Sequence, residues 1–372
     1  MNIYTLNDLI LSKNQGINTT TEKIKYCTSG HKVLRAKNIL DNKIDQSDLV
    51  YIDDNTYNTS NDNYKPKIDD VLYTNIGSQF GSACVLKTND YFITWNILRL
   101  VPNKKLISPL YLSYLLNSNK ERLRNLNSSS TMPFVSGNIL CKEKFNIHSL
   151  EEQQHIVNII GSIDDLIESN NKLVLKLLSI LNNKLEYLIT KSTEFIPLKS
   201  IISERKEKIG LNDVKLLSVV NTGELVLQDE YFDKNTASAD MKKYKLIRKF
   251  DYAYNPARIN IGSIGMLKEN YLGAISPIYV VFEIDENYKY YLDFYKSSEY
   301  MRKYIEKKSS GSVRQNLPFD EFASIEIPNI NTEFLKEFNS LCELYYRKIN
   351  DLKTKTIKLQ AIKDQYLKKF FG

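Results

Sequence analysis

The feature that most restricts the fold of this chain is a run of forty residues in its middle, Leu150 to Ile189, whose pattern predicts one uninterrupted helix. Helices in globular domains usually extend over about three or four turns. Apolar residues recur here at alternating spacings of four and three, from Ile156 to Leu188, interrupted only by Asn170 and Lys184. This is the heptad spacing of a coiled coil, which needs a partner helix, and a polar residue such as Asn170 can fix the register of such a pair.

A second stripe with the same spacing lies near the C-terminus. Its predicted positions are 334, 338, 341, 345, 348, 352, 355, 359, 362 and 366, with lysines at 348 and 355. Residues 151–190 contain three Lys and Arg against six Asp and Glu, whereas residues 331–372 contain nine against five. Because the two stripes match in length and the segments differ in the sign of their charge, we predict that the two helices pair with each other as a coiled coil. The alternative is that each helix packs separately on its own domain.

The sequence also repeats itself at an offset of about 180 residues, which is the pattern of a duplicated structural unit. Residues 109–147 match residues 289–327, so that Tyr111 falls on Tyr291. Upstream of these segments, DDVLYTNIGSQFGSACVL parallels FDYAYNPARINIGSIGMLKE, in which an apolar run leads into a Gly-Ser turn and a second apolar run. We therefore expect two copies of one unit.

Within each half, short β-branched and aromatic runs are bounded by Gly, Pro, Asn and Asp, which is typical of strands and turns. We predict the α+β class: two pseudo-repeated globular domains, each with a small antiparallel sheet and flanking helices, and each followed by one of the long helices. The predicted boundaries are 1–148 for the first domain, 149–190 for the central helix, 191–330 for the second domain and 331–372 for the C-terminal helix.

Composition limits the classes of function. The chain has a formal net charge of +7, which is compatible with a nucleic-acid partner without requiring one. Four cysteines and three histidines are scattered without the spacing of a zinc site or a disulfide framework, so we expect no metal. We find neither a transmembrane pattern nor a secretory signal, and expect a cytoplasmic protein that does not bind a membrane.

Motifs for catalysis are incomplete. Residues 254–257 read YNPA and resemble part of the Asn-Pro-Pro-aromatic motif of adenine methyltransferases, but the second proline and the aromatic residue are missing. There is no glycine-rich loop for S-adenosylmethionine and no Walker A motif for ATP. The acidic pairs Asp53-Asp54 and Asp69-Asp70 lack the further residues of a nuclease site and are interpreted as turn or solvated residues. We therefore expect a non-catalytic protein that binds no cofactor itself.

The order of these elements resembles a known family. A globular half is followed by SLEEQQHIVNIIGSIDDLIESNNKLV, then by a second half containing YKLIRKFDYAYNPARINIGSIGML and SSGSVRQNL, and then by a second long helix. Over essentially its whole length the chain looks like the specificity subunit of type I restriction-modification systems. It departs from the family's pattern in two places: the second helix begins INTEFLKEF instead of with Glu-Glu-Gln, and the first half is compact.

The resemblance implies that the two halves are target-recognition domains, each reading one part of a split site in double-stranded DNA. It also implies that the two helices pack antiparallel, as a coiled-coil spacer between the domains. It also implies two modification subunits as partners, which carry S-adenosylmethionine and methylate adenine, and restriction subunits that use ATP where the system has them. A different class of function stays open, in which the chain is a coiled-coil adaptor that joins protein partners and binds no DNA.

Candidate DNA-binding residues are those whose side chains suit phosphates or base edges and that fall in predicted loops. In the first half these are Arg35, Lys37, Asn38, Asn75, Ser78 and Gln79, and in the second half Asn221, Tyr254, Asn255, Arg258, Asn260 and Ser263. A further set matches the family's junction before each long helix and suits contact with either DNA or a modification subunit. These residues are Ser130, Thr131, Met132, Ser312, Arg314 and Gln315.

Overall fold

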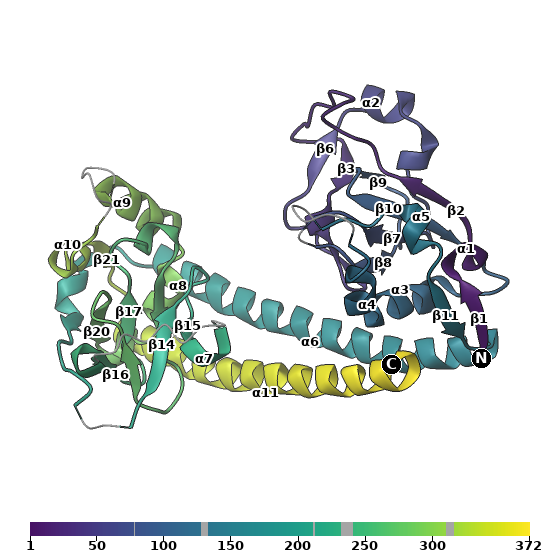
Figure 1. Cartoon of the computed structure of the whole chain (residues 1–372). Coiled ribbons are helices and arrows are strands. Elements are labelled where there is room, and N and C mark those ends of the chain that lie inside the picture. Colours follow the sequence, from purple (N-terminus) through teal and green to yellow (C-terminus); the bar gives the residue numbers. More distant parts are fainter. Residues whose placement is uncertain (78, 128–132, 211–212, 232–240, 310–315) are drawn as a thin grey trace. The chain divides into compact units, whose positions relative to one another are not determined.

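The contacts of the chain divide it into two units, each built from a sheet-rich domain and parts of both long helices (Figure 1). In this computed structural model the described residues are 1–372 apart from 78, 128–132, 211–212, 232–240 and 310–315. Unit 1 comprises Met1–Asn170 and Thr354–Gly372, and unit 2 comprises Asn171–Lys353. The long helices are α6 (Leu150–Thr190) and α11 (Thr332–Phe371), and each contributes residues to both units.

The main sheet of unit 1 has four antiparallel strands in the order β2-β10-β7-β8. A three-stranded sheet has the order β6-β3-β9, with β3 and β9 parallel, and β1 pairs with β11 and β4 with β5. The strands are β1 (Asn2–Thr5), β2 (Ile10–Gln15), β3 (His31–Leu34), β4 (Ile39–Leu40), β5 (Lys43–Ile44), β6 (Val50–Ile52), β7 (Val71–Thr74), β8 (Ala83–Val85), β9 (Tyr91–Ile93), β10 (Ile97–Pro102) and β11 (Lys144–Ile147). The helices are α1 (Leu6–Leu9), η1 (Ala36–Asn38), α2 (Asp54–Thr59), η2 (Asp62–Tyr64), α3 (Pro109–Ser118), α4 (Lys120–Arg124) and α5 (Gly137–Leu140).

Unit 2 has the same main sheet, in the order β13-β20-β17-β18 and again antiparallel. Its second sheet has the order β15-β14-β19-β16, in which β14 and β19 are parallel, and β12 pairs with β21. The strands are β12 (Phe195–Pro197), β13 (Ile202–Glu204), β14 (Lys215–Val219), β15 (Leu225–Leu227), β16 (Lys245–Ile247), β17 (Tyr252–Tyr254), β18 (Ile264–Met266), β19 (Gly273–Ile275), β20 (Val280–Ile284) and β21 (Glu326–Pro328). The helices are η3 (Leu198–Ser200), α7 (Gln228–Tyr231), η4 (Met241–Lys243), η5 (Ile259–Ile261), η6 (Glu286–Tyr288), α8 (Tyr291–Tyr295), α9 (Glu299–Ser309) and α10 (Phe319–Ala323).

The two units repeat one topology, which confirms the predicted α+β class and duplication. Tyr73 of β7 lies opposite Ala83 of β8, and Tyr254 of β17 lies opposite Ile264 of β18, so the two hairpins correspond residue by residue. The second sheet of unit 2 differs by one additional strand, β16, which pairs with β19. Strands β7 and β17 are buried along their whole length because each lies in the interior of its four-stranded sheet.

The long helices pair within each unit, and they run antiparallel. In unit 1, Lys363 Nζ lies 2.6 Å from Asp164 Oδ1, and the Asn170 amide donates to the Thr356 hydroxyl at 3.3 Å. Residue numbers therefore fall along α11 as they rise along α6. In unit 2, apolar residues of the two helices join one core, which includes Leu181, Leu185, Leu188, Leu335, Phe338 and Cys342. The predicted pairing of α6 with α11 is confirmed. The alternative, in which each helix packs separately on its own domain, is wrong.

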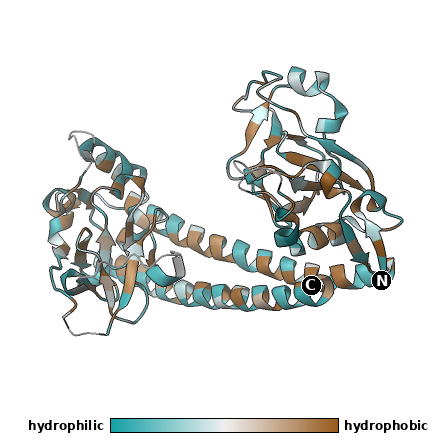
Figure 2. Ribbon diagram, in the orientation of Figure 1, coloured by the Kyte–Doolittle hydropathy of each residue, from teal (hydrophilic) through white to brown (hydrophobic). Residues whose placement is uncertain are grey.

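The predicted apolar stripe is confirmed in α6 and is wrong at four of its ten positions in α11. Every predicted position from Ile156 to Leu188 is buried or half-buried, and Figure 2 shows hydrophobic residues recurring along the helix. In α11 six of the ten predicted positions are buried or half-buried, whereas Phe334, Lys348, Lys355 and Ile362 are exposed and lie one residue too early. Their neighbours Leu335 and Ile349 are buried instead. The prediction failed because adjacent apolar residues satisfy the same spacing, and only the partner surface selects between them.

A buried amide attaches the first domain to the start of α6. The side chain of Gln153 is fully buried, accepts a hydrogen bond from the Ser108 backbone N–H at 2.9 Å, and donates to the carbonyls of Leu106 and His148. All of these residues belong to unit 1. The amide therefore satisfies three backbone groups that have little access to water.

Replacing Gln153 by alanine should lower the free energy of unfolding of unit 1 by about 1–3 kcal/mol, because it leaves buried backbone groups without partners. The only tryptophan, Trp95, lies in unit 1, so its fluorescence during urea unfolding reports on this unit. The matched control is Gln154→Ala, because the exposed Gln154 amide bonds only to Asn158 one turn further along α6. Equal midpoints for the two variants would contradict the prediction.

No helix in the part of the chain that the structure describes is both long enough and apolar enough to cross a membrane.

Candidate functional site

Corresponding loops join the third and fourth strands of the two main sheets. Residues 75–82 connect β7 to β8, and residues 255–263 connect β17 to β18. Both loops contain a glycine with positive φ, Gly81 at 96° and Gly262 at 92°, followed by a buried serine. A Cβ at Gly262 would lie 2.5 Å from a backbone oxygen of the turn at 221, so a larger residue is excluded by both conformation and space. The duplication has therefore conserved the geometry of this loop within the chain.

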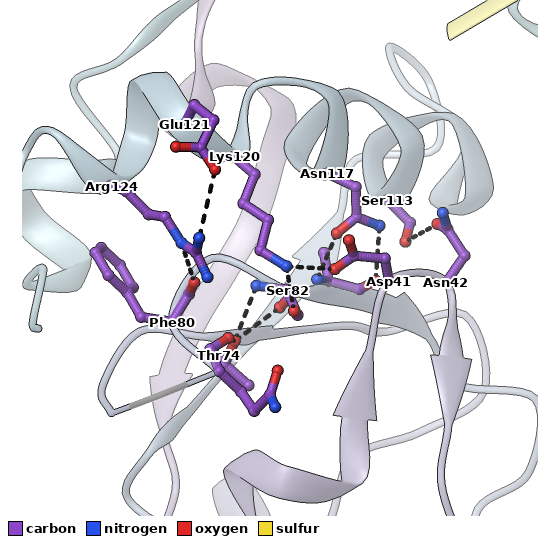
Figure 3. A network of polar contacts seen from close by, with 12 residues as sticks. Asp41, Asn42, Thr74, Phe80, Ser82, Ser113, Asn117, Lys120, Glu121 and Arg124 are labelled. Atoms are coloured by element: carbon purple, nitrogen blue, oxygen red, sulfur yellow. Dashed lines mark hydrogen bonds and ion pairs between the residues drawn. The ribbon is translucent and has the colours of Figure 1, made fainter. Parts of the chain in front are cut away.

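A network of polar contacts holds the loop of unit 1 from one side (Figure 3). The Thr74 hydroxyl donates to the Ser82 carbonyl at 3.1 Å and accepts from the Ser82 N–H at 3.0 Å. Lys120 Nζ reaches the Ser82 hydroxyl at 2.8 Å and Asp41 Oδ1 at 2.9 Å, and Arg124 Nε donates to the Phe80 carbonyl at 2.8 Å. These contacts come from β7, α4 and a distant turn, and they fix the loop's backbone.

The other side of each loop contacts the chain that follows one of the undescribed segments. In unit 1, the Gly77 N–H donates to the Pro133 carbonyl at 3.0 Å. In unit 2, the Leu317 N–H donates to the Pro256 carbonyl at 3.1 Å. The predicted junction residues Ser130, Thr131, Met132, Ser312, Arg314 and Gln315 lie outside the described residues. Among the described residues, Pro133 and Leu317, which come shortly after these segments in the sequence, lie beside the two loops.

The predicted residues of the first half fall into two places. Arg35, Lys37 and Asn38 surround Asp48: Arg35 is half-buried and donates to the Asp48 carbonyl at 2.7 Å, and Lys37 is exposed and paired with the Asp48 carboxylate. Asn38 is buried, accepts from the Arg35 N–H at 2.9 Å, and donates to the Asp45 carbonyl at 3.0 Å. The Asn38 amide therefore shapes this turn and offers nothing to a ligand at the surface.

The remaining candidates of the first half belong to the 75–82 loop. Asn75 is fully buried, exchanges hydrogen bonds with the Gln15 amide at 2.9 and 3.1 Å, and donates to the Val135 carbonyl at 3.1 Å. Gln79 is half-buried, and its carbonyl accepts from the Thr74 hydroxyl. Ser78 lies outside the described residues. Sequence reasoning could not foresee the burial of Asn75, because its partners are about sixty residues away on both sides.

The candidates of the second half divide in the same way. Tyr254 is fully buried and donates to the Leu317 carbonyl at 3.0 Å, and Ser263 is buried and donates to the Val219 carbonyl at 3.4 Å. The other four remain accessible: Asn221 and Arg258 are exposed, and Asn255 and Asn260 are half-buried. The structure brings the turn at Asn221 beside the 255–263 loop, since the Gly262 position lies against the Asn221 carbonyl.

A groove lies next to these residues in unit 2, with a cavity volume of about 560 Å³. It is lined by the turn at 221–223, by η5 and the residues that follow it, and by Lys296, Ser297, Arg302 and Ile305 around α9. Sequence reasoning missed Ile261, Lys296 and Arg302 as groove residues. The basic character of the α9 segment, EYMRKYIEKKS, was the only signal, and it did not indicate which side chains face the groove.

A buried carboxylate supports one wall of this groove. Asp293 on α8 lies 2.8 Å from Lys296 Nζ and 2.8 Å from Lys268 Nζ, and accepts from the Tyr346 hydroxyl of α11 at 2.7 Å. Burial raises the pKa of Asp293, but the two lysines outweigh burial and hold it well below its usual value. Lys296 also donates to the Gly223 carbonyl at 2.8 Å, so the charged cluster fixes the turn at the groove's edge.

The acidic pair Asp69-Asp70 ends a turn, as predicted, in which the Asp70 N–H donates to the Lys67 carbonyl at 3.0 Å. Asp70 is not solvated, however. Its side chain is buried and pairs with Arg99 Nε of β10 at 2.6 Å. Asp251, at the equivalent place before β17, pairs with Arg205 Nε at 2.8 Å, and burial raises its pKa. Both aspartates accept a backbone N–H three residues earlier, from Lys67 and Arg248. Their roles are structural.

Among the described residues, no group of three His, Cys, Asp or Glu side chains is arranged to hold a metal ion.

Residues 1–179 match the sequence model of the family described as "Type I restriction modification DNA specificity domain". The putative type I restriction enzyme MjaX specificity subunit of Methanocaldococcus jannaschii is 29% identical over 200 residues, which is 51% of this chain and 45% of that protein. The type I restriction enzyme MjaVIII specificity subunit of the same organism is 22% identical over 314 residues, 74% of this chain and 73% of that protein. The match to the MjaX subunit therefore spans less than half of its length.

A solved structure shares the fold. The crystal structure of the type I restriction-modification system S subunit from M. genitalium matches with a TM-score of 0.60 and 14% identity. The match covers 100% of this chain and 96% of that one. At this identity the likeness concerns the fold alone.

Proposed function

We propose that this chain is the DNA-recognition subunit of a type I restriction-modification complex. The support is the match of residues 1–179 to the family of type I restriction modification DNA specificity domains and the similarity to two specificity subunits. Residues 1–148 and 191–330 form two recognition domains that read the two parts of a split site in double-stranded DNA. The chain docks two modification subunits, which bind S-adenosylmethionine and methylate adenine, and restriction subunits that use ATP where the system has them. The chain itself performs no catalysis, and the complex acts in the cytoplasm.

The observation that carries this proposal is the duplicated loop with different side chains. The loops 75–82 and 255–263 share a strand context, a positive-φ glycine and a buried serine. At equivalent positions, however, one carries Gln79 where the other carries Asn260. Two domains that recognise different base sequences need the same backbone framework with different polar side chains in the loop. The reason is that side-chain donors and acceptors distinguish base edges.

Burial narrows the residues that we propose for contact with DNA. The accessible candidates are Arg35, Lys37, Gln79, Asn221, Asn255, Arg258 and Asn260. Amide side chains such as that of Asn260 suit the paired donor and acceptor of adenine, and arginine suits guanine or phosphate. Asn38, Asn75, Tyr254 and Ser263 instead hold the backbone that presents these groups. The junction residues remain proposed contacts to either DNA or a modification subunit.

The long helices suit the role of a spacer. Helix α6 has 41 residues, which corresponds to roughly 60 Å at about 1.5 Å per residue. Two domains joined in one chain gain effective concentration at their second half-site once the first is bound. We propose that the length of the paired helices sets the number of base pairs between the half-sites.

The test is to express the chain with a candidate modification subunit and to sequence methylated bases across the host genome. We expect adenine methylation at one split motif, and its loss when this chain is omitted. If no motif appears and the complex shows no DNA binding, the proposal is wrong. The adaptor function would then be favoured if the chain still assembled with protein partners.

Within that complex, Arg258→Ala should weaken DNA binding through the second half. Loss of one phosphate contact should reduce the slope of log affinity against log salt by about one, and loss of a base contact should cost about 1–3 kcal/mol at one base pair. Lys199→Ala is the matched control, because it removes one exposed positive charge of unit 2 that belongs to η3 and not to the 255–263 loop or the groove lining. DNA-binding titrations at several salt concentrations measure the salt slope and the affinity of each variant. An effect no larger than that of the control would remove Arg258 from the proposed set.

A further inference from the structure

Ile261 is an exposed apolar side chain at the edge of the unit 2 groove. It is 50% exposed, whereas Ile259, Ile264 and Ile305, which also line the groove, are buried. Polar groups surround it: Asn221 and Arg302 are exposed, and Asn260 directly precedes it. The groove therefore offers one apolar contact among amide and guanidinium groups.

The duplication shows that the fold does not require this exposure. The position equivalent to Ile261, immediately before the positive-φ glycine, is Phe80 in unit 1. Phe80 is only 2% exposed and belongs to the same apolar core as Leu123 of α4. The same loop position thus points into the core in one domain and towards an open groove in the other, so the exposure of Ile261 is a property of the second domain's surface.

The chemistry of this surface matches one feature of DNA. In the major groove, the C5-methyl of thymine is the one apolar group on a base edge, while amides bind adenine and arginine binds phosphate or guanine. We propose that Ile261 contacts a thymine methyl in the second half-site and that Arg302 binds a neighbouring phosphate. This inference rests on the proposed function and adds the identity of one base that the second domain recognises.

The groove is held in shape before any ligand binds. Gly262, which follows Ile261, has φ 92°, and a Cβ there would lie 2.5 Å from the Asn221 carbonyl oxygen, so this part of the loop packs closely against the 221–223 turn. That turn is fixed on its other side by Lys296, whose charge is balanced by the buried Asp293. A preorganised wall lets a single methyl contact discriminate between bases, because little binding free energy is lost in ordering the site.

The test uses the assembled complex with its modification subunits and the duplex that it methylates. Each thymine of the two half-sites is replaced in turn by uracil, which lacks only the C5-methyl, and affinities are measured for the wild-type chain and for Ile261→Ala. We expect one second-half position at which uracil weakens wild-type binding about fourfold, the value of one buried methyl group. At that position uracil should have no further effect on Ile261→Ala. In the first half, the two proteins should respond equally.

Two further variants keep the result interpretable. Ile278→Ala removes another exposed isoleucine of unit 2, 63% exposed and outside the groove lining, and should retain the full uracil effect. Arg302→Gln should lower affinity for every duplex by the same factor and leave the uracil effect unchanged.

The inference is overturned if no second-half thymine shows an effect that Ile261→Ala abolishes, if Ile278→Ala abolishes it equally, or if the second half-site contains no thymine. It is also overturned if Ile261→Ala impairs assembly with the modification subunit while the uracil effect persists, because the groove then serves a protein. In each case the wild-type complex still methylates a split motif, so the proposed function stands. Absence of any methylation by the wild-type complex would instead refute that function.

Discussion

Replacing Asp293 by asparagine is expected to lower the free energy of unfolding of unit 2 by about 3–5 kcal/mol, the usual cost of removing one partner from a buried ion pair. The carboxylate is almost inaccessible and contacts two lysines and the Tyr346 hydroxyl. Without its charge, Lys296 and Lys268 repel each other in a poorly solvated place. Urea unfolding followed by circular dichroism measures the loss, and fluorescence of Trp95 in unit 1 identifies any change outside unit 2.

Asp351→Asn is the matched control, because Asp351 is an exposed aspartate of α11 in the same unit. Its free energy of unfolding should stay within about 0.5 kcal/mol of that of the wild type. A loss for Asp293→Asn no larger than this would mean that the lysines find other partners or water, and would contradict the role assigned to the cluster.

The same variant makes a pH-dependent prediction. The pKa of Asp293 is lower in the folded protein than the value of about 3.9 expected for an unfolded chain, so the folded state favours the ionised form. The resulting stabilisation is fully present above about pH 4 and is lost as the pH falls towards the folded pKa. The stability difference between wild type and Asp293→Asn should therefore shrink below about pH 4. A constant difference from pH 6 to pH 3 would exclude this linkage.

A matched insertion in both long helices should change the gap between the half-sites. Seven residues preserve the heptad phase, so we would place seven after Asn171 in α6 and seven between Lys353 and Thr354 in α11. The first point lies one residue from the boundary of the two units in α6, and the second lies at their boundary in α11. The insertion adds about 10 Å, or roughly three base pairs at about 3.4 Å each. Methylated-base sequencing should show a correspondingly longer gap, or a loss of methylation if the longer spacing cannot be read.

The control is the same insertion in α6 alone. It shifts one helix against the other and breaks the antiparallel register marked by the Asn170 and Thr356 pair, so methylation should be lost. An unchanged gap with full methylation after the matched insertion would show that the helices do not set the spacing, although the chain would still recognise DNA.

Some of the fold was predictable because its signals are local or repeated. The α6 stripe, the duplicated halves and the loops between apolar runs follow from residue spacing, which the chain carries wherever its partners lie. Asn170 was predicted to be able to fix the register of the helix pair, and its amide bonds to the Thr356 hydroxyl. The loops 75–82 and 255–263 were likewise chosen from their Gly-Ser turns, and the structure places them at equivalent positions.

The orientation of individual side chains was decided only by tertiary structure. Leu335 rather than Phe334 faces the core because the partner helix and domain of unit 2 lie on that side. Asn75 and Tyr254 are interior residues because distant backbone carbonyls, those of Val135 and Leu317, come within hydrogen-bonding distance. Phe80 and Ile261 occupy one loop position in two environments. Sequence spacing thus determined where the helices, strands and loops lie, whereas the contacts between segments far apart in the chain determined which side chains remain for a ligand, because burial depends on partners that local spacing does not specify.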